Sequence, residues 1–299
     1  MTGASRLSST GTVHANGIDL RYETIGDPAD PALLLIMGHG TQLDAWDASF
    51  CQEFVTNGFF VIRFDNRDVG LSTRFDGRVP DIEAIRGGDP SSAVYGLEDM
   101  ADDAAGLLDA LGVDRAHVLG ASMGGMIAQT LAIRHPDRVR SLCSIMSTTG
   151  APGVGEADPA ALAVIRSGAP RTPEEIVESQ VAMARALRGP GFPFDEAGTR
   201  ARAEHAYRRA HYPEGKLRQQ AAILVAPDRT AALRELSIPT VVIHGADDPL
   251  VGVSGGAATA AAIPDAWLVV VPGLGHEFPV GVRARVASEF AANAKRADR

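Results

Sequence analysis

The sequence predicts an α/β fold in which a mostly parallel central sheet is flanked by helices on both faces. Three observations support this prediction. Short apolar runs of strand length alternate with helical patterns along most of the chain. A serine between two glycines stands where one such run gives way to a helix. Aspartate and histidine side chains follow the ends of later runs, which is where functional sites lie in an open parallel sheet.

The N-terminal half begins with a hairpin and then alternates strands with helices. Asn16-Gly17 is a strong signal for a tight hairpin turn, and continuous apolar runs indicate strands covered on both faces. The segment from Thr73 to Gly96, rich in Gly, Pro and Asp, is expected to be irregular. The expected strands are Thr12 to His14, Leu20 to Ile25, Ala32 to Met37, Phe59 to Phe64, Ala116 to Leu119 and Val139 to Met146. The expected helices are Asp47 to Asn57, Leu97 to Leu111 and Met123 to His135.

The pattern changes after residue 148. Helical patterns separated by Gly-Pro clusters replace the alternation, which predicts an α-helical lid at 149–236 inserted between two parts of one core, 1–148 and 237–299. We expect this lid to select the substrate and to contribute no catalytic group. The alternation then resumes with strands at Thr240 to Gly245 and Trp267 to Val271 and helices at Val253 to Ile263 and Val282 to Ala294.

Composition and charge exclude several classes of function. The net charge of −9 over 299 residues argues against a nucleic-acid or anionic-membrane surface. Cys51 and Cys143 are expected in the core and have no metal-ligand spacing. The polar first residues lack the apolar core of a signal peptide, and no later stretch is long enough to span a bilayer. We therefore expect a cytoplasmic protein.

Gly120-Ala121-Ser122-Met123-Gly124 has the spacing of a nucleophile elbow, in which a serine stands on a sharp turn between a strand and a helix. Side chains two positions before and after the serine have no room there, so both positions are glycine. The free N–H groups at the start of the helix favour an anion. The apolar run before Ser122 and the helical pattern after it supply the required context.

A base and an acid for this serine are expected after the last two strands. His276 follows the strand at Trp267 to Val271, and Asp247 and Asp248 both follow the strand at Thr240 to Gly245. Serine needs a neighbouring base to become a nucleophile, and a carboxylate orients that base. The chain order Ser, Asp, His is the order found in α/β-hydrolases. The residues alone leave the choice between the two aspartates open.

The chain resembles the α/β-hydrolase superfamily over nearly its whole length. More narrowly it resembles the aclacinomycin methylesterase group and related actinobacterial lipase/esterase-like proteins. The residues that carry the resemblance are Met37-Gly38, the run from Asp65 to Ser72, the elbow around Ser122, Asp248-Pro249 and the run from Gly273 to His276.

The resemblance implies an α/β-hydrolase fold with an inserted lid, and it implies roles for individual residues. His276 is the general base, and Asp248 rather than Asp247 is the acid. The backbone N–H groups of Met123 and His39 form the oxyanion hole. Here the chain departs from the commoner His-Gly-x pattern, because Met37 takes the first place and His39 the third. A backbone donor tolerates this change, which places an imidazole near the acyl pocket.

The expected activity is hydrolysis of carboxylic esters, of the carboxylesterase or methylesterase type, through an acyl-enzyme on Ser122, without a cofactor or metal ion. The expected partner is a small apolar ester, with no nucleic acid and no membrane span, and the expected state is a monomer or homodimer. Lactonase, thioesterase, cofactor-free haloperoxidase or perhydrolase and carbon–carbon bond hydrolase activities stay open, because the same triad serves them all. A non-catalytic ligand receptor is the alternative of a different class, and the intact Ser, Asp and His set argues against it.

Several other polar residues are expected to be structural. Asp65 and Arg67 are expected to brace their loop rather than to form a catalytic pair. Surface and pocket-wall roles are both open for His205 and His211 in the lid. The remaining expectations are core groups at His117 and His244, a helix-end residue at His135 and a solvated helix face from Arg200 to Arg209.

Overall fold

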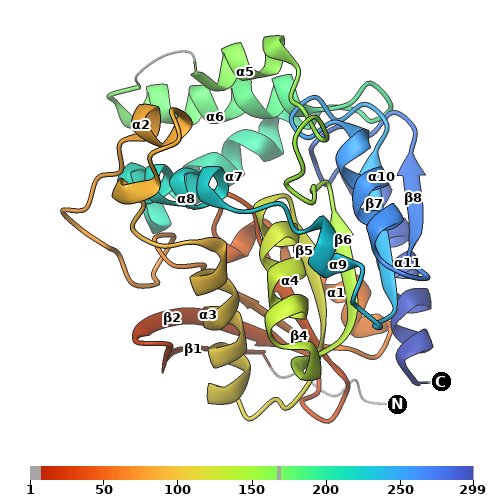
Figure 1. The fold of residues 1–299 in the computed structure, drawn as a ribbon. Helices are drawn as coiled ribbons and strands as arrows, with labels where there is room; N and C mark the ends of the chain where they lie inside the picture. Colours follow the sequence, from red (N-terminus) through yellow and green to blue (C-terminus); the bar gives the residue numbers. More distant parts are fainter. Residues whose placement is uncertain (1–7, 167–169, 299) are drawn as a thin grey trace.

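One eight-stranded sheet runs through this computed structural model, which describes residues 8–166 and 170–298 (Figure 1). The strand order is β1-β2-β4-β3-β5-β6-β7-β8. β2 pairs antiparallel with both β1 and β4, and every other pairing is parallel, so the predicted mostly parallel sheet is confirmed. The strands are β1 (Ser8–Ala15), β2 (Ile18–Ile25), β3 (Ala32–Ile36), β4 (Phe60–Phe64), β5 (Ala116–Ala121), β6 (Val139–Ile145), β7 (Thr240–Gly245) and β8 (Trp267–Val271).

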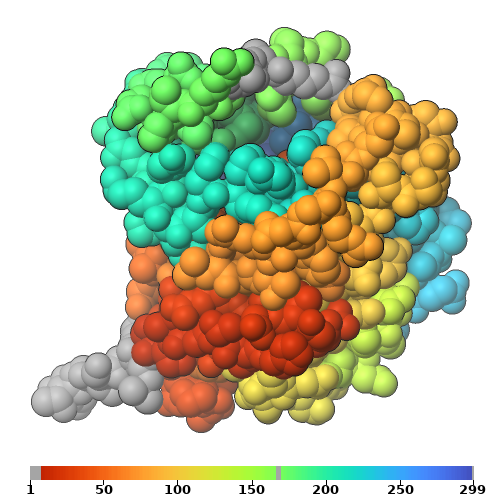
Figure 2. Space-filling view, turned by 90° about the vertical axis from the view of Figure 1, so that its left-hand side faces the viewer, coloured from red at the N-terminus to blue at the C-terminus, as the bar shows by residue number. Residues whose placement is uncertain are grey.

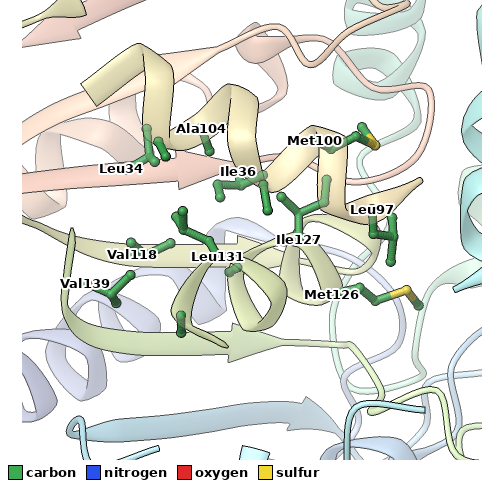
Figure 3. Close-up of a cluster of buried hydrophobic side chains, with 14 of the residues drawn as sticks. Leu34, Ile36, Leu97, Met100, Ala104, Val118, Met126, Ile127, Leu131 and Val139 are labelled. Carbon is green, nitrogen blue, oxygen red and sulfur yellow. The ribbon is translucent and has the colours of Figure 1, made fainter. Parts of the chain in front are cut away.

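Helices cover both faces of the sheet, because successive side chains of a strand point to opposite sides. In β3, Leu34 and Ile36 belong to a buried cluster with side chains of α3 and α4 (Figure 3). Leu33 and Leu35 belong to a second cluster with side chains of α1 and α11. The helices that pack on the sheet are α1 (Ala48–Thr56), α3 (Leu97–Ala110), α4 (Met123–Arg134), α10 (Val253–Ala262) and α11 (Val280–Ala294).

The described part of residues 149–236, hereafter the helical segment, consists of helices and loops. Its helices are α5 (Pro159–Arg166), α6 (Pro173–Leu187), α7 (Glu196–Arg209), α8 (Pro213–Val225) and α9 (Thr230–Leu233). Figure 1 shows α5 to α8 above the edge at which the parallel strands end. The short α9 packs instead against α4 and α10 of the core.

The structure departs from the sequence prediction in a few elements. The segment expected to be irregular contains α2 (Ile82–Arg86), which begins because the Asp81 carboxylate accepts a hydrogen bond from the N–H of Ala84 at 2.9 Å. β5 continues through the glycine of the elbow to Ala121, because Gly120 keeps its place in the sheet opposite Ile36 and Ser144.

Both cysteines are buried and free, as predicted. Burial raises the pKa of the Cys51 thiol from 9.0 to about 11, so this thiol is protonated and unreactive at neutral pH. No helix in residues 8–166 and 170–298 is long and apolar enough to cross a membrane.

Candidate active site

Ser122 lies on a strained turn between β5 and α4. Its φ of 57° and ψ of −122° lie outside the regions that residues with side chains ordinarily adopt. A Cβ atom on Gly120 would lie 2.1 Å from the carbonyl oxygen of Gly124, and one on Gly124 would lie 2.1 Å from that of Ile36. Both glycines are therefore required by sterics, as the elbow spacing predicts.

Two backbone N–H groups next to Ser122 point to an anion site. Within residues 8–166 and 170–298, neither the N–H of Met123 nor that of His39 has a hydrogen-bond acceptor. The loop that carries His39 passes directly over the serine, since a Cβ on Gly38 would lie 3.1 Å from Ser122 Cβ. Unpaired N–H groups close to a serine hydroxyl can stabilise an oxyanion that forms there. The assignment of these two N–H groups as oxyanion donors stays a prediction.

His276 and Asp248 are joined by a hydrogen bond after the last two strands of the sheet. His276 Nδ1 lies 2.8 Å from Asp248 Oδ2, while the other carboxylate oxygen accepts the N–H groups of Leu250 and Val251, each at 2.9 Å. The Asp248 side chain is fully buried. Because the carboxylate accepts the proton on Nδ1, the imidazole is held with Nε2 free to accept another proton.

Asp247 points to a different partner. Its Oδ2 accepts the N–H of Gly273 at 2.8 Å, and its own N–H donates to the carbonyl oxygen of Leu274 at 3.0 Å. The side chain therefore fastens the loop after β7 to the loop after β8. The structure brings His276 to Asp248, the aspartate that the family resemblance selects.

The Ser122 hydroxyl has no hydrogen-bond partner in the described residues, so the structure does not join it to His276. Ser122 follows β5, Asp248 follows β7 and His276 follows β8, so all three leave the same edge of the sheet. Catalytic hydrogen bonds are often long before a substrate binds and tighten in the complex. The arrangement is consistent with a triad whose Ser–His contact forms with substrate.

Asp65 and Arg67 have the structural roles predicted for them. The Asp65 carboxylate accepts the N–H groups of Leu43 and Leu71 at 2.8 and 2.9 Å, and it also pairs with Arg209. The Arg67 guanidinium forms two hydrogen bonds to Asp103 on α3. Arg209 differs from the predicted solvated face, because only 14% of its side chain is exposed. The end of α7 is bonded to the core there.

The other histidines singled out by sequence have partners away from Ser122. Burial lowers the pKa of His244, so this ring is neutral, and its Nε2 lies 3.6 Å from Asp248 Oδ2. The partners are Ser141 for His117, the Val251 carbonyl for His244, Asp102 for His135, Asp44 for His205 and the Tyr207 ring for His211. The predicted core roles of His117 and His244 and the helix-end role of His135 are confirmed.

Sequence reasoning missed a backbone contact between the helical segment and the His276 loop. A Cβ on Gly189 would lie 2.2 Å from the carbonyl oxygen of Gly273, and one on Gly275 would lie 2.4 Å from the N–H nitrogen of Gly189. The N–H of Gly191 donates to Gly273, and that of His276 donates to Leu187, each at 2.8 Å. We call this set, Gly189, Gly191, Gly273 and Gly275, the glycine contact. Its sequence signal is a pair of Gly-x-Gly turns.

Glu277, in the loop of His276, adds a hydrogen bond to the glycine contact. Its carboxylate accepts the N–H of Gly189 at 2.9 Å. Burial raises the pKa of Glu277, and the hydrogen bonds and the nearby Arg188 oppose that shift. The residue directly after His276 is therefore bonded to the helical segment.

We expect Gly275→Ala to weaken both stability and activity. The added methyl group has no room, so the free energy of unfolding should fall by about 1–3 kcal/mol, and kcat should fall because His276 is the next residue. Gly281→Ala is the control, because its Cβ would meet only the edge of the Phe192 ring, at 3.2 Å. Denaturant unfolding and ester turnover measure both effects. Equal values for the two variants would show that the glycine contact does not position the base.

The loop that carries His39 also contacts α8. The N–H of Gly40 donates to Gln219 Oε1 at 2.7 Å, and His39 Nε2 lies 2.8 Å from the carbonyl oxygen of Lys216. Because a carbonyl only accepts, His39 Nε2 carries the proton. The His39 imidazole is thus bonded to the helical segment, a role that the sequence analysis does not anticipate.

A hollow in the surface lies beside these elements. Figure 2 shows it bounded by α8 in cyan, by α5 and α6 in green and by the orange segment that contains α2. Blue atoms from the C-terminal part of the chain form its floor. The hollow therefore lies between the helical segment and the segment that contains α2.

Comparison with known proteins agrees with this fold. Rhodomycin D methylesterase DnrP from Streptomyces peucetius is 29% identical over 94% of this chain and 96% of its own length. 3-Oxoadipate enol-lactonase 2 from Acinetobacter baylyi is 29% identical over 82% of each chain. The solved meta-cleavage product hydrolase from Pseudomonas fluorescens IP01 has the same fold, with a TM-score of 0.73 and 19% identity over 96% of this chain and 98% of that one. The model of the alpha/beta hydrolase fold family matches residues 31–280, and the protein therefore belongs to that family.

Proposed function

We propose that the protein hydrolyses carboxylic esters by a Ser122–His276–Asp248 triad. The observation that carries the proposal is the arrangement around one sheet edge. In the described residues, the strained Ser122 is followed by the unpaired N–H of Met123 and lies against the loop of His39, whose N–H is also unpaired. A histidine held by a buried carboxylate follows a strand that ends at the same edge of the sheet. This is the constellation that acyl transfer requires.

The first half-reaction forms an acyl-enzyme. Ser122 Oγ attacks the ester carbonyl carbon while its proton moves to His276 Nε2. The N–H groups of Met123 and His39 donate to the oxygen that becomes negative. As the tetrahedral intermediate collapses, the C–O bond to the alcohol breaks, and His276 returns the proton to the leaving alkoxide.

The second half-reaction releases the acid. Water takes the place of the alcohol and gives a proton to His276 Nε2 as its oxygen attacks the acyl carbon. The same two N–H groups stabilise the second tetrahedral intermediate. The bond to Ser122 Oγ then breaks, the serine recovers its proton and the carboxylic acid leaves. Throughout, Asp248 keeps the imidazole oriented and stabilises its positive charge.

The comparisons favour an ester over the other substrates of such a triad. A relative that spans nearly the whole chain is named a methylesterase, which supports simple esters. A second relative is named an enol-lactonase. A lactone is a cyclic ester, and the same steps open it, with the alcohol retained in the product. Lactonase activity is therefore the second candidate.

We further propose that residues 149–236 act as the lid and residues 1–148 and 237–299 as the core. The position of α5 to α8 above the strand ends supports this division. The packing of α9 against α4 and α10 suggests that the last residues of the helical segment serve the core instead.

The test is turnover together with chemical labelling. The purified protein should hydrolyse methyl and 4-nitrophenyl esters, and one equivalent of a phosphonate ester should stop turnover and label Ser122. A peptide map by mass spectrometry identifies the labelled residue, while a lactone, a thioester, and bromide with peroxide test the alternatives. A label on any other serine would contradict the triad. Oxidation of bromide without ester turnover would favour a haloperoxidase.

A further inference from the structure

Lys216 lies against the loop that supplies one of the two proposed oxyanion donors. A Cβ atom on Gly40 would lie 2.7 Å from Lys216 Cγ and 2.9 Å from both Cδ and Cε. Gly40 has a φ of +62°, and no side chain separates the lysine stem from the loop backbone. Only one residue, His39, lies between Gly40 and Gly38, which contacts Ser122. The lysine stem is therefore a near neighbour of the proposed reaction centre.

Hydrogen bonds fix the position of this lysine relative to the loop that carries His39. Gln219, one helical turn further along α8, is fully buried, accepts the N–H of Gly40 and donates to the carbonyl oxygen of Arg67 at 2.8 Å. The carbonyl of Lys216 itself accepts from the His39 ring at 2.8 Å. These hydrogen bonds join the helix to the loop, so the backbone of Lys216 is held beside the loop.

The Lys216 ammonium has no carboxylate partner in residues 8–166 and 170–298, in contrast to its neighbours. Arg218 on the same helix pairs with Asp68, and Arg209 at the end of α7 pairs with Asp65, each at 2.8 Å. The surrounding protein lowers the pKa of Lys216, and no nearby carboxylate opposes that shift. The side chain of Lys216 is partly buried, and a partly buried cation without a partner gains a favourable interaction when an anion binds to it.

We propose that the Lys216 ammonium binds an anionic group of the substrate, so that the preferred esters carry a carboxylate in addition to the ester. This inference rests on the proposed ester hydrolysis and refines the apolar substrate expected from sequence. A charge-assisted hydrogen bond between the ammonium and that carboxylate would set the orientation of such a substrate.

Pairs of esters of equal shape and different charge test the proposal. Monomethyl succinate and methyl 4-methylpentanoate place a carboxylate or an isopropyl group on the acyl side. O-acetylglycolate and isobutyl acetate make the same comparison on the alcohol side. The wild type should prefer the anionic member of one pair by kcat/KM. Lys216→Met should reduce that preference by about tenfold or more, chiefly through KM, as expected for loss of a charged hydrogen bond.

Two further variants sharpen the result. Lys216→Arg keeps the charge and should retain most of the preference. Lys295→Met is the matched control, because Lys295 is the only other lysine in the chain and lies in the C-terminal 3-10 turn. It should leave the ratio unchanged. Thermal unfolding of each variant separates a loss of preference from a loss of folding.

The outcomes distinguish this inference from the proposed function. Equal kcat/KM within both pairs for the wild type would overturn the role of Lys216, and so would a preference that survives Lys216→Met. Either result leaves ester hydrolysis itself intact. Absence of turnover on all four esters, with no phosphonate label on Ser122, would instead refute the proposed function.

Discussion

Replacement of Ser122 by alanine is expected to lower kcat for ester hydrolysis by about 10⁴-fold or more, because no other group in the turn can form the acyl-enzyme. The fold should persist. The substitution removes one oxygen atom, and that hydroxyl has no hydrogen-bond partner in the described residues. Steady-state turnover of a 4-nitrophenyl ester and the circular dichroism melting curve measure the two effects.

Ser147→Ala is the control that distinguishes loss of the nucleophile from loss of a hydrogen bond that supports the turn. The Ser147 hydroxyl donates to the backbone carbonyl of Ser122 at 2.8 Å, so it helps to hold the turn without facing the reacting atoms. Its loss should reduce kcat by no more than about tenfold, the scale of one neutral hydrogen bond. If Ser122→Ala kept most of the wild-type turnover, the chemistry would have to begin at another residue.

Asp248→Asn is expected to lower kcat by about 10⁴-fold, whereas Asp247→Asn should change it only slightly. An amide at position 248 cannot carry the negative charge that stabilises the imidazolium, and it favours the wrong tautomer of His276. An amide at position 247 keeps an oxygen that can still accept the N–H of Gly273. The two substitutions are chemically identical and one residue apart, so each is the control for the other.

Rate measurements over a range of pH complete this comparison. The Asp248→Asn loss should persist at every pH at which the protein stays folded, because it arises from orientation and charge rather than from incomplete ionisation. Unfolding curves for both variants guard against a loss of structure. A larger loss at Asp247, or equal losses at the two positions, would refute the assignment of the acid.

The parts of the site that sequence predicts are those fixed by local constraints. Gly120 and Gly124 can be predicted because a side chain at either position would clash with nearby backbone. The clash comes from the turn around Ser122 for Gly120 and from the end of β3 for Gly124. The positions of Asp248 and His276 follow from counting strand ends in a parallel sheet. The choice between Asp247 and Asp248 does not follow in this way, because one residue of offset in a loop reverses which carboxylate reaches the imidazole.

The parts that sequence misses depend on segments that are distant along the chain. Nothing near Lys216 in the sequence indicates that its stem lies on Gly40, 176 positions earlier. The same is true of Arg209, which the local pattern of charges places on a solvated face and which the fold directs into the core. Short elements such as α2 are also missed, because five residues are too few to show a helical period.

The glycine contact constrains how a substrate enters. The end of α6 and the loop of His276 share backbone hydrogen bonds, and the glycines leave no gap between them. If the helical segment swung away as one rigid body, these bonds would break and the loop of His276 would lose its support. The glycine contact therefore favours a route of entry during which Leu187 to Gly191 stay in place. A molecule opened at the glycine contact would admit an ester, but His276 would no longer be held in the place that the proposed mechanism needs.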